Sequence, residues 1–305
     1  MTRCSRRWLA TVTLSAISNN YNPIERIHTM NLVNTYDSVG DYVAKGETLA
    51  KSKRGSSSSR GDSAWYGTAN MDEAVKLVRG GWDKRPNLSK LSKDIDSQTS
   101  ANIDKMAMEH QVQGAYVDVG AYLEGVPECM VEFIDQPEPK VVTIAFNIST
   151  FASMPEKAFA NRGAVTLAIC NKLQLAGYSV EIKAYCTVKA TKHGEKRGRH
   201  TTVFTVKDSG QMLDEDSLAF WCCHPSALRR LHFLHNESLS AEACEKFGYN
   251  AGHGGYGTPC KLSEHPKGEK QVDADVNVDF QEANFSKAVN EYNKLIAKLN
   301  EGLAS

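Results

Sequence analysis

The stretch that decides the fold is VVTIAFNI, residues 141–148. It is a short, mostly apolar run that is enriched in β-branched residues, with Pro139 before it and Ser149 and Thr150 after it. Runs of this length and composition are typical of a strand that is covered on both faces, because both sets of alternating side chains are apolar. We therefore expect residues 141–148 to form a central strand of a sheet.

A helix and a second strand follow this run. Ser153, Pro155 and Glu156 form a helix-start signature, in which the serine side chain accepts a backbone N–H. Apolar residues then recur at helical spacing up to Gly177, a residue type that tolerates the left-handed conformation at a helix end. Residues 179–188 alternate apolar and polar side chains. Together these patterns predict a right-handed βαβ unit with parallel strands.

The rest of the core is expected to add both strands and helices. The β-branched run 201–206 predicts a strand antiparallel to 179–188, with the basic stretch 189–200 as a long tip. Helical patterns at 213–220, 225–234 and 285–303 and an edge-strand pattern at 272–280 follow. The sequence predicts an α/β fold with a mixed, mostly parallel sheet and flanking helices, plus a helical N-terminal region.

Composition and pattern divide the chain into four parts. Asn70 and Glu73 predict the start of a helix at 69–77, and a looser pattern predicts another at 88–108. Residues 46–63 are rich in Ser, Gly and Lys, which favours a flexible loop. We expect an extension or tail at 1–29, a polar N-terminal segment and flexible loop at 30–63, a helical N-terminal region at 64–127, and an α/β core domain with a C-terminal helix at 128–305.

Charge and composition exclude several classes of protein. The chain has 305 residues, with 36 Lys and Arg against 36 Asp and Glu, so it is not a wholly cationic nucleic-acid coat protein. A hydrophobic content of 41% is ordinary for a globular protein. No apolar run approaches the roughly 20 residues that cross a bilayer, so no membrane partner is expected. The eight cysteines, several of them in apolar stretches, favour buried free thiols and a cytoplasmic location.

The end of the strand 141–148 is a candidate metal corner. A βαβ unit whose second strand turns back as an antiparallel neighbour resembles the start of a von Willebrand factor A domain. In that family the first strand ends in Asp-x-Ser-x-Ser, whose carboxylate and hydroxyls bind a divalent cation. Here the residues are Asn147, Ile148, Ser149, Thr150 and Phe151, so a charged ligand and a hydroxyl are lost.

The resemblance implies a von Willebrand A-like or Rossmann-like three-layer core with a degenerate metal corner at Asn147, Ser149 and Thr150. We expect no metal and no other cofactor there, because hard cations need the lost oxygen ligands. The alternative role for Asn147 and Ser149 is to cap the following helix or to bind the backbone of the loop.

Cysteine and histidine residues are a second candidate metal site. Cys222, Cys223 and His224 are contiguous, and Cys244, His253 and Cys260 follow downstream. No pair has the short spacing, repeated in a second pair, that identifies a zinc site. Buried thiols and a hydrogen-bonded histidine are therefore favoured over zinc.

The basic tip is a candidate site for nucleic acid. Its cations are Lys183, Lys189, Lys192, Lys196, Arg197 and Arg199. Such a ribbon can bind phosphates without reading sequence, and Tyr249 and Tyr256 in the Gly-rich segment 248–260 could stack on bases. The alternatives are a solvated hairpin tip and aromatic rings that pack back onto the domain.

Several strings resemble an uncharacterised family of tailed-bacteriophage proteins: AWYGTANMDEAVKLVRGGW (64–82), GAYLEGVPECM (120–130), NRGAVTLAICNKLQLAGYSVEI (161–182) and LDEDSLAFWCCHPSALRRLHF (213–233). The resemblance implies a phage-encoded protein of the host cytoplasm, with no catalytic residues to carry over. It also makes Met30 the more natural start.

We therefore expect a non-enzymatic phage accessory protein that acts as a protein-interaction domain, with a phage or host protein as its partner. One alternative is a single-stranded nucleic-acid-binding protein in phage replication or transcription. The other is a zinc-dependent enzyme that uses the Cys and His residues named above.

Overall fold

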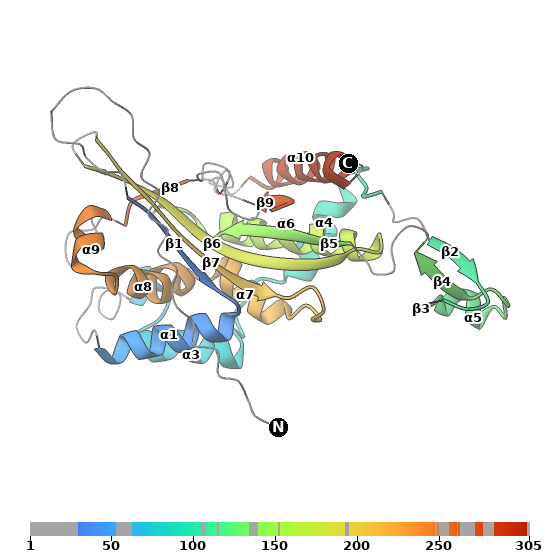
Figure 1. The fold of residues 1–305 in the computed structure, drawn as a ribbon, viewed down its shortest axis with the longest axis horizontal. Coiled ribbons are helices and arrows are strands. Elements are labelled where there is room, and N and C mark those ends of the chain that lie inside the picture. The colour runs from blue at the N-terminus through green and yellow to red at the C-terminus, as the bar shows by residue number, and fades with distance from the viewer. Residues whose placement is uncertain are drawn as a thin grey trace.

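The computed structural model describes residues 30–52, 63–104, 108–114, 116–133, 140–151, 153–192, 195–247, 249, 256–260, 262, 272–276 and 284–303. Figure 1 shows a long, curved main sheet with helices packed against it, and a smaller sheet at one end of the molecule. Among the described residues, no helix is long and apolar enough to span a lipid bilayer.

The main sheet has six strands: β1 (Met30–Tyr36), β5 (Val141–Asn147), β6 (Ser179–Lys192), β7 (Glu195–Lys207), β8 (Thr258–Pro259) and β9 (Ala274–Val276). The order is β1-β7-β6-β5-β9, and β8 pairs with β6. The pairs β1–β7, β5–β6 and β5–β9 are parallel, whereas β6 is antiparallel to both β7 and β8. The predicted α/β fold with a mixed, mostly parallel sheet is confirmed.

Strand β5 lies in the middle of the core, because every residue from Val142 to Asn147 is buried. Helix α6 (Glu156–Leu175) then leads to the parallel neighbour β6, as the sequence predicts. The start of the helix differs from the prediction. Pro155 is the N-cap residue and no side chain caps the helix, so Ser153 does not have the expected role. The helix is followed, as expected, by Gly177 with a φ of 95°.

The other helices that surround the main sheet are α1 (Val39–Ser52), α2 (Ser63–Tyr66), α3 (Met71–Gly80), α4 (Leu88–Ser97), α7 (Glu215–Cys223), the π-helix η2 (Ala227–His232), α8 (Phe233–Glu237), α9 (Ala241–Phe247) and α10 (Phe285–Leu303). Asn70 caps α3, as predicted: its Oδ1 accepts from the Glu73 N–H at 2.8 Å, and the Glu73 carboxylate accepts from the N–H of Ala69, the residue before the cap, at 2.6 Å.

Two segments depart from the sequence patterns. Residues 30–52 form β1 and α1, which no pattern in that polar segment predicts. The helix expected at 88–108 ends at Ser97, and the chain forms a strand again at Met108. The expected tail at 1–29 and most of the expected loop, 53–62, lie outside the described residues. The four domain boundaries stay a prediction.

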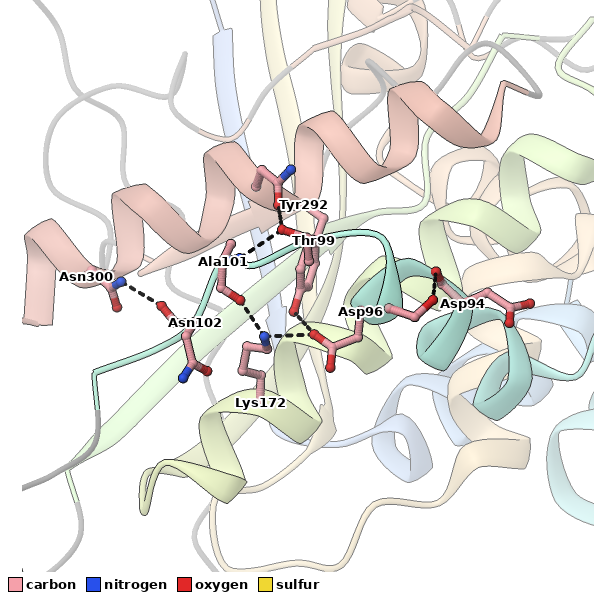
Figure 2. A network of polar contacts seen from close by, with 10 residues as sticks. Asp94, Asp96, Thr99, Ala101, Asn102, Lys172, Tyr292 and Asn300 are labelled. Carbon is pink, nitrogen blue, oxygen red and sulfur yellow. Dashed lines mark hydrogen bonds and ion pairs between the residues drawn. The ribbon is translucent and has the colours of Figure 1, made fainter.

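Lys172 of α6 ties the segment after α4 to the C-terminal helix α10 (Figure 2). Its Nζ lies 2.8 Å from Asp96 Oδ1 and donates to the Ala101 carbonyl at 2.5 Å. The Tyr292 hydroxyl of α10 donates to the same Asp96 oxygen at 3.0 Å. Three helices are thereby joined at one partly buried polar cluster.

A second, antiparallel sheet consists of β2 (Met108–Gln111), β3 (Tyr116–Val117) and β4 (Met130–Phe133), in the order β2-β4-β3. The short helix α5 (Val119–Leu123) lies between β3 and β4 in the chain. This part of the region that we expected to be helical therefore contains strands. Figure 1 shows the small sheet at the opposite end of the molecule from the β6–β7 tip.

Candidate protein-interaction surface

The short helix α5 and the turn after it carry large apolar side chains that nothing in the described structure covers. Val119, Tyr122 and Leu123 are 64%, 64% and 77% exposed, and Val126 follows them at 41%. Their spacing of three and four residues places them on one side of α5 and of the turn after it. Most large apolar residues of a folded chain are buried, so a cluster of exposed ones is informative.

Local hydrogen bonds hold this short helix in place. Asp118 is its N-cap residue and accepts from the N–H groups of Gly120 and Ala121 at 2.9 and 3.1 Å. His110 Nε2 of β2 lies 3.0 Å from the other Asp118 oxygen, and this hydrogen bond lowers the pKa of Asp118. A five-residue helix has little stability of its own, so these contacts position its apolar side.

The turn between β2 and β3 also depends on a close backbone approach. A Cβ atom at Gly114 would lie 2.7 Å from the carbonyl oxygen of Val131 in β4. Only glycine fits at this distance, so the sheet that carries α5 requires Gly114.

The charge around α5 has one sign. Between Lys105 and Lys140 the chain has no Lys or Arg. The acidic residues in this interval are Glu109, Asp118, Glu124, Glu128, Glu132, Asp135 and Glu138, the last two outside the described residues. We call the exposed residues Val119, Tyr122, Leu123 and Val126, together with Glu124 and Glu128, the α5 surface. The sequence reasoning missed this surface, although the long interval without a basic residue signals it.

The predicted metal corner lies where expected in the sheet, at the end of β5. Asn147 is fully buried: its Nδ2 donates to the Cys260 carbonyl at 3.0 Å, and its Oδ1 accepts from the Ser149 N–H at 2.9 Å and from the Ser149 hydroxyl at 2.5 Å. Both side chains therefore bind the loop rather than cap α6. Thr150 follows, partly buried.

The residues proposed as zinc ligands are spread over several elements. Cys222 and Cys223 end α7, and the Cys223 thiol donates to the Phe159 carbonyl at 3.4 Å. The Cys244 thiol instead points at the carbonyl of Asn236, 3.5 Å away. Burial raises the pKa of Cys222 to about 12, which keeps its thiol protonated at neutral pH.

His224 is engaged elsewhere, because the Ser226 N–H donates to its Nδ1 at 3.1 Å. Cys260 is buried beside β6, where its backbone N–H donates to the Thr187 carbonyl at 3.0 Å. His253 lies outside the described residues. Within the part of the chain that the structure describes, no three His, Cys, Asp or Glu residues are arranged to hold a metal ion.

The basic tip is a two-stranded antiparallel ribbon, as expected, in which Lys189 pairs with Arg199 across β6 and β7. Both side chains are partly buried, and Lys183, nearer the core, forms an ion pair with Glu181 at 3.2 Å. The side chains of Lys192, Lys196 and Arg197 lie outside the described residues.

The two candidate base-stacking tyrosines pack onto the domain. Tyr249 is buried, and its hydroxyl lies 3.0 Å from His200 Nδ1. The Tyr256 ring stacks on Phe233 with ring centroids 3.5 Å apart, and its hydroxyl donates to Glu237. These contacts correspond to the alternative that the sequence left open.

A cluster of buried histidines also escaped the sequence reasoning. Tyr42 binds His232 Nδ1 through its hydroxyl at 2.9 Å and His235 Nε2 through its carbonyl at 3.1 Å. The Tyr36 hydroxyl donates to His235 Nδ1 at 3.1 Å. Burial lowers the pKa of His200 and of His235 to about 3, so both rings are neutral at physiological pH.

Comparisons with known proteins identify a family but no activity. Residues 18–300 match the model of a family described as a domain of unknown function, DUF7192. A GMP synthase (glutamine-hydrolyzing) of Synechococcus sp. strain CC9902 is 39% identical over 72 residues, which are 24% of this chain and 14% of that protein. No solved structure matches the chain. Because the family match extends over most of the sequence, the chain belongs to the DUF7192 family.

Proposed function

We propose that this protein is a non-enzymatic phage accessory protein whose α5 surface binds a cationic protein partner. The observation that carries the proposal is the set of exposed apolar side chains on α5, within an interval that has acidic residues and no basic ones. Apolar contacts supply affinity in most protein interfaces, whereas charge sets the partner and the rate of association.

Charge complementarity selects the class of partner. A second copy of the same α5 surface brings like charges together, which disfavours a symmetric dimer through this face. Nucleic acid is disfavoured there for the same reason, since phosphates repel Glu124 and Glu128. The matching surface is a protein with an apolar groove and basic residues at its rim.

The apolar side chains of the α5 surface are large enough to contribute measurably to the free energy of binding. Burying a side chain of the size of Leu or Tyr contributes about 1.5–3 kcal/mol when it starts fully exposed. Tyr122 and Leu123 start at 64% and 77% exposure, so together they are worth about 2–4 kcal/mol in a complex. Losing both would weaken binding by between about 30-fold and several hundred-fold.

The proposal also includes a von Willebrand A-like core, a phage origin and a location in the host cytoplasm. The strand order β7-β6-β5-β9, with a parallel crossover next to an antiparallel hairpin, supports a von Willebrand A-like core. The strings that resemble tailed-phage proteins support a phage origin. The free thiols of the described cysteines support a reducing compartment such as the host cytoplasm.

Affinity capture from cells infected by the encoding phage tests the interaction. The tagged chain is compared with the double variant Tyr122→Ser/Leu123→Ser and with Leu175→Ser, which removes an apolar side chain that is 82% exposed at the end of α6. We expect one basic protein that survives nuclease treatment, elutes with salt, is lost with the double variant and is retained with Leu175→Ser. Equal recovery with the double variant would refute the proposal.

The extended ribbon of β6 and β7, with Lys189 opposite Arg199, favours single-stranded nucleic-acid binding as a second candidate. A fluorescence titration with single-stranded DNA at two salt concentrations measures it. Under this hypothesis Arg197→Glu/Arg199→Glu abolishes the salt-dependent part of the binding, and unchanged binding would discard the ribbon as a site.

A further inference from the structure

The main sheet ends on one side at β1, and no strand of the described structure pairs with the outer edge of β1. Figure 1 shows β1 beside β7, its parallel neighbour. All seven residues of β1 pair with β7, so the strand is extended over its whole length. A strand at the edge of a sheet presents a row of backbone N–H and C=O groups, which can pair with another chain.

Side-chain contacts hold β1 in place. Asn34 Nδ2 lies 2.9 Å from His200 Nε2, and the Tyr36 hydroxyl lies 3.1 Å from His235 Nδ1. The Tyr36 ring also packs edge-on against the Tyr42 ring of α1, with ring centroids 5.1 Å apart. The outer edge is therefore preformed, and pairing with a second strand needs little further ordering of the backbone.

The sequence of β1 lacks the features that protect an edge strand from pairing. Soluble proteins protect such edges with charged side chains, proline, bulges or very short strands. The sequence MNLVNTY contains no charged residue and no proline, and its register with β7 runs unbroken from Met30 to Tyr36. The outer edge of β1 is therefore long, regular and uncharged.

Other margins of the two sheets have this protection. Strand β9, at the opposite side of the main sheet, has three residues, and one of them is Asp275. Strand β2, at a margin of the small sheet, has four residues and includes Glu109 and His110. Both strands are short and carry ionisable side chains. The contrast identifies β1 as the edge that is suited to pairing.

Charge favours a second copy of the chain as the occupant of this edge. No like charges meet when β1 lies opposite another β1, because the strand has no charged side chain. Helix α1, which follows β1 and packs against it, carries both signs of charge in equal number: Asp41, Glu47, Lys45 and Lys51. The α5 surface differs, because its like charges disfavour a symmetric dimer there.

We propose that β1 pairs antiparallel with β1 of a second copy, so that two main sheets form one continuous sheet. A two-fold axis places the outer edge of β1 against itself. In an antiparallel pair the N–H and C=O groups of such an edge meet the C=O and N–H groups of the same edge in the copy. Pairing occupies the edge in both copies, so the assembly closes at two chains.

The mass of the purified full chain in solution tests the proposal. Sedimentation equilibrium should give twice the mass of one chain, in a reversible monomer–dimer equilibrium. The double variant Val33→Lys/Thr35→Lys adds charge on the side of β1 opposite to Leu32 and Tyr36, which pack against the core. Like charges across the pair should raise the dissociation constant of the dimer about tenfold or more.

The matched control is Val141→Lys/Leu175→Lys, which adds the same charge at the start of β5 and the end of α6. These positions are 48% and 82% exposed, and β7 and β6 lie between β1 and β5 in the sheet. The control should keep the dissociation constant of the unmodified chain. A monomeric unmodified chain, which is the result expected if the edge binds a different protein, would overturn the proposal. An unchanged dissociation constant in the β1 variant would overturn it equally.

Hydrogen–deuterium exchange of the unmodified chain, below and above the dissociation constant, locates the interface without any variant. Backbone amides within residues 30–36 should exchange more slowly at the higher concentration, because those that point away from β7 become hydrogen-bonded. Amides of α10 should exchange at the same rate at both concentrations. A dimer in which exchange at residues 30–36 does not depend on concentration would have its interface elsewhere, and the proposal would be wrong.

Discussion

The buried histidines make the fold sensitive to mild acid. In the unfolded chain a histidine has a pKa of about 6.5, so it becomes protonated when the pH falls from 7 to 5. In the folded chain His200 and His235 have pKa values of about 3, so their rings stay neutral over the same interval. The folded pKa is the lower one, so the unfolded state binds more protons and stability falls as the pH falls. The loss begins near pH 6.5 and continues down to about pH 3.

The size of the effect follows from the two pKa values. For each of His200 and His235, proton binding to the unfolded chain between pH 7 and pH 5 removes about 2 kcal/mol of stability. His224, whose pKa burial lowers to about 4, adds about 2 kcal/mol in the same interval. These three histidines together account for about 6 kcal/mol, which is comparable with the whole stability of many domains. His232, whose pKa burial also lowers, adds to this loss.

Urea unfolding at pH 7, 6 and 5 measures this loss as the change in the free energy of unfolding. His235→Gln should reduce the total drop by about 2 kcal/mol, because it removes one of the titrating groups. His110→Gln is the matched control, since His110 has a half-exposed side chain on the small sheet. A free energy that is constant from pH 7 to 5, or a drop that is unchanged in His235→Gln, would refute the reasoning.

Three further predictions concern close packing and the polar cluster of Figure 2. Gly163→Ala in α6 should lower the free energy of unfolding by about 1–3 kcal/mol despite the better helix propensity of Ala, because the new Cβ would lie 2.9 Å from Cys223 Sγ. In the control Gly302→Ala the new Cβ has no atom within 4 Å, so the free energy of unfolding should not fall. Urea unfolding of the two variants measures the difference. Gly114→Ala should speed limited proteolysis of the small sheet while leaving cleavage in the helices around the main sheet unchanged, and an unchanged cleavage rate in the small sheet would contradict the role given to that turn. Lys172→Met should lower the free energy of unfolding by about 1–3 kcal/mol in urea, because Asp96 and the Ala101 carbonyl lose a shared donor; an unchanged midpoint would show that the cluster adds no stability.

The parts of the fold that sequence predicts are those with strong local signals. The apolar run at 141–148 has to be covered on both faces, and its residues Val141–Asn147 form the strand β5. The Asn70 side chain accepts from the Glu73 N–H and the Glu73 carboxylate accepts from the Ala69 N–H, without any distant partner, so the start of α3 can be found from its local sequence. Gly177 likewise marks the end of α6 through its own backbone conformation.

The parts that sequence misses depend on distant contacts. Strand β1 is stabilised by pairing with β7, in a register that joins Asn34 to Thr202, and nothing in its polar sequence shows that partner. The histidine cluster joins residues 190 or more positions apart, such as Tyr42 and His232. Tertiary contacts of this kind override local propensity, so a single sequence does not identify them.

The candidate sites also differ in whether they depend on local sequence or on distant contacts. The position of Asn147 at the end of a central strand follows from the local pattern, but its hydrogen bond to the Cys260 carbonyl spans more than a hundred residues. The α5 surface is different, because its charge is visible in the sequence and only its exposure is not. From sequence alone, large apolar side chains are ordinarily predicted to lie in the core. In the folded chain Leu123 is instead 77% exposed.

Site-specific photo-crosslinking from position 123 tests the central claim most directly. A photoreactive phenylalanine analogue replaces Leu123 in one protein and Leu175 in another, and both are irradiated in cells infected by the encoding phage. The account predicts one discrete adduct, to a protein with a basic surface, from position 123 only, and its loss in a Glu124→Lys/Glu128→Lys background. No adduct from position 123, or the same adducts from both positions, would contradict a docking role for the α5 surface.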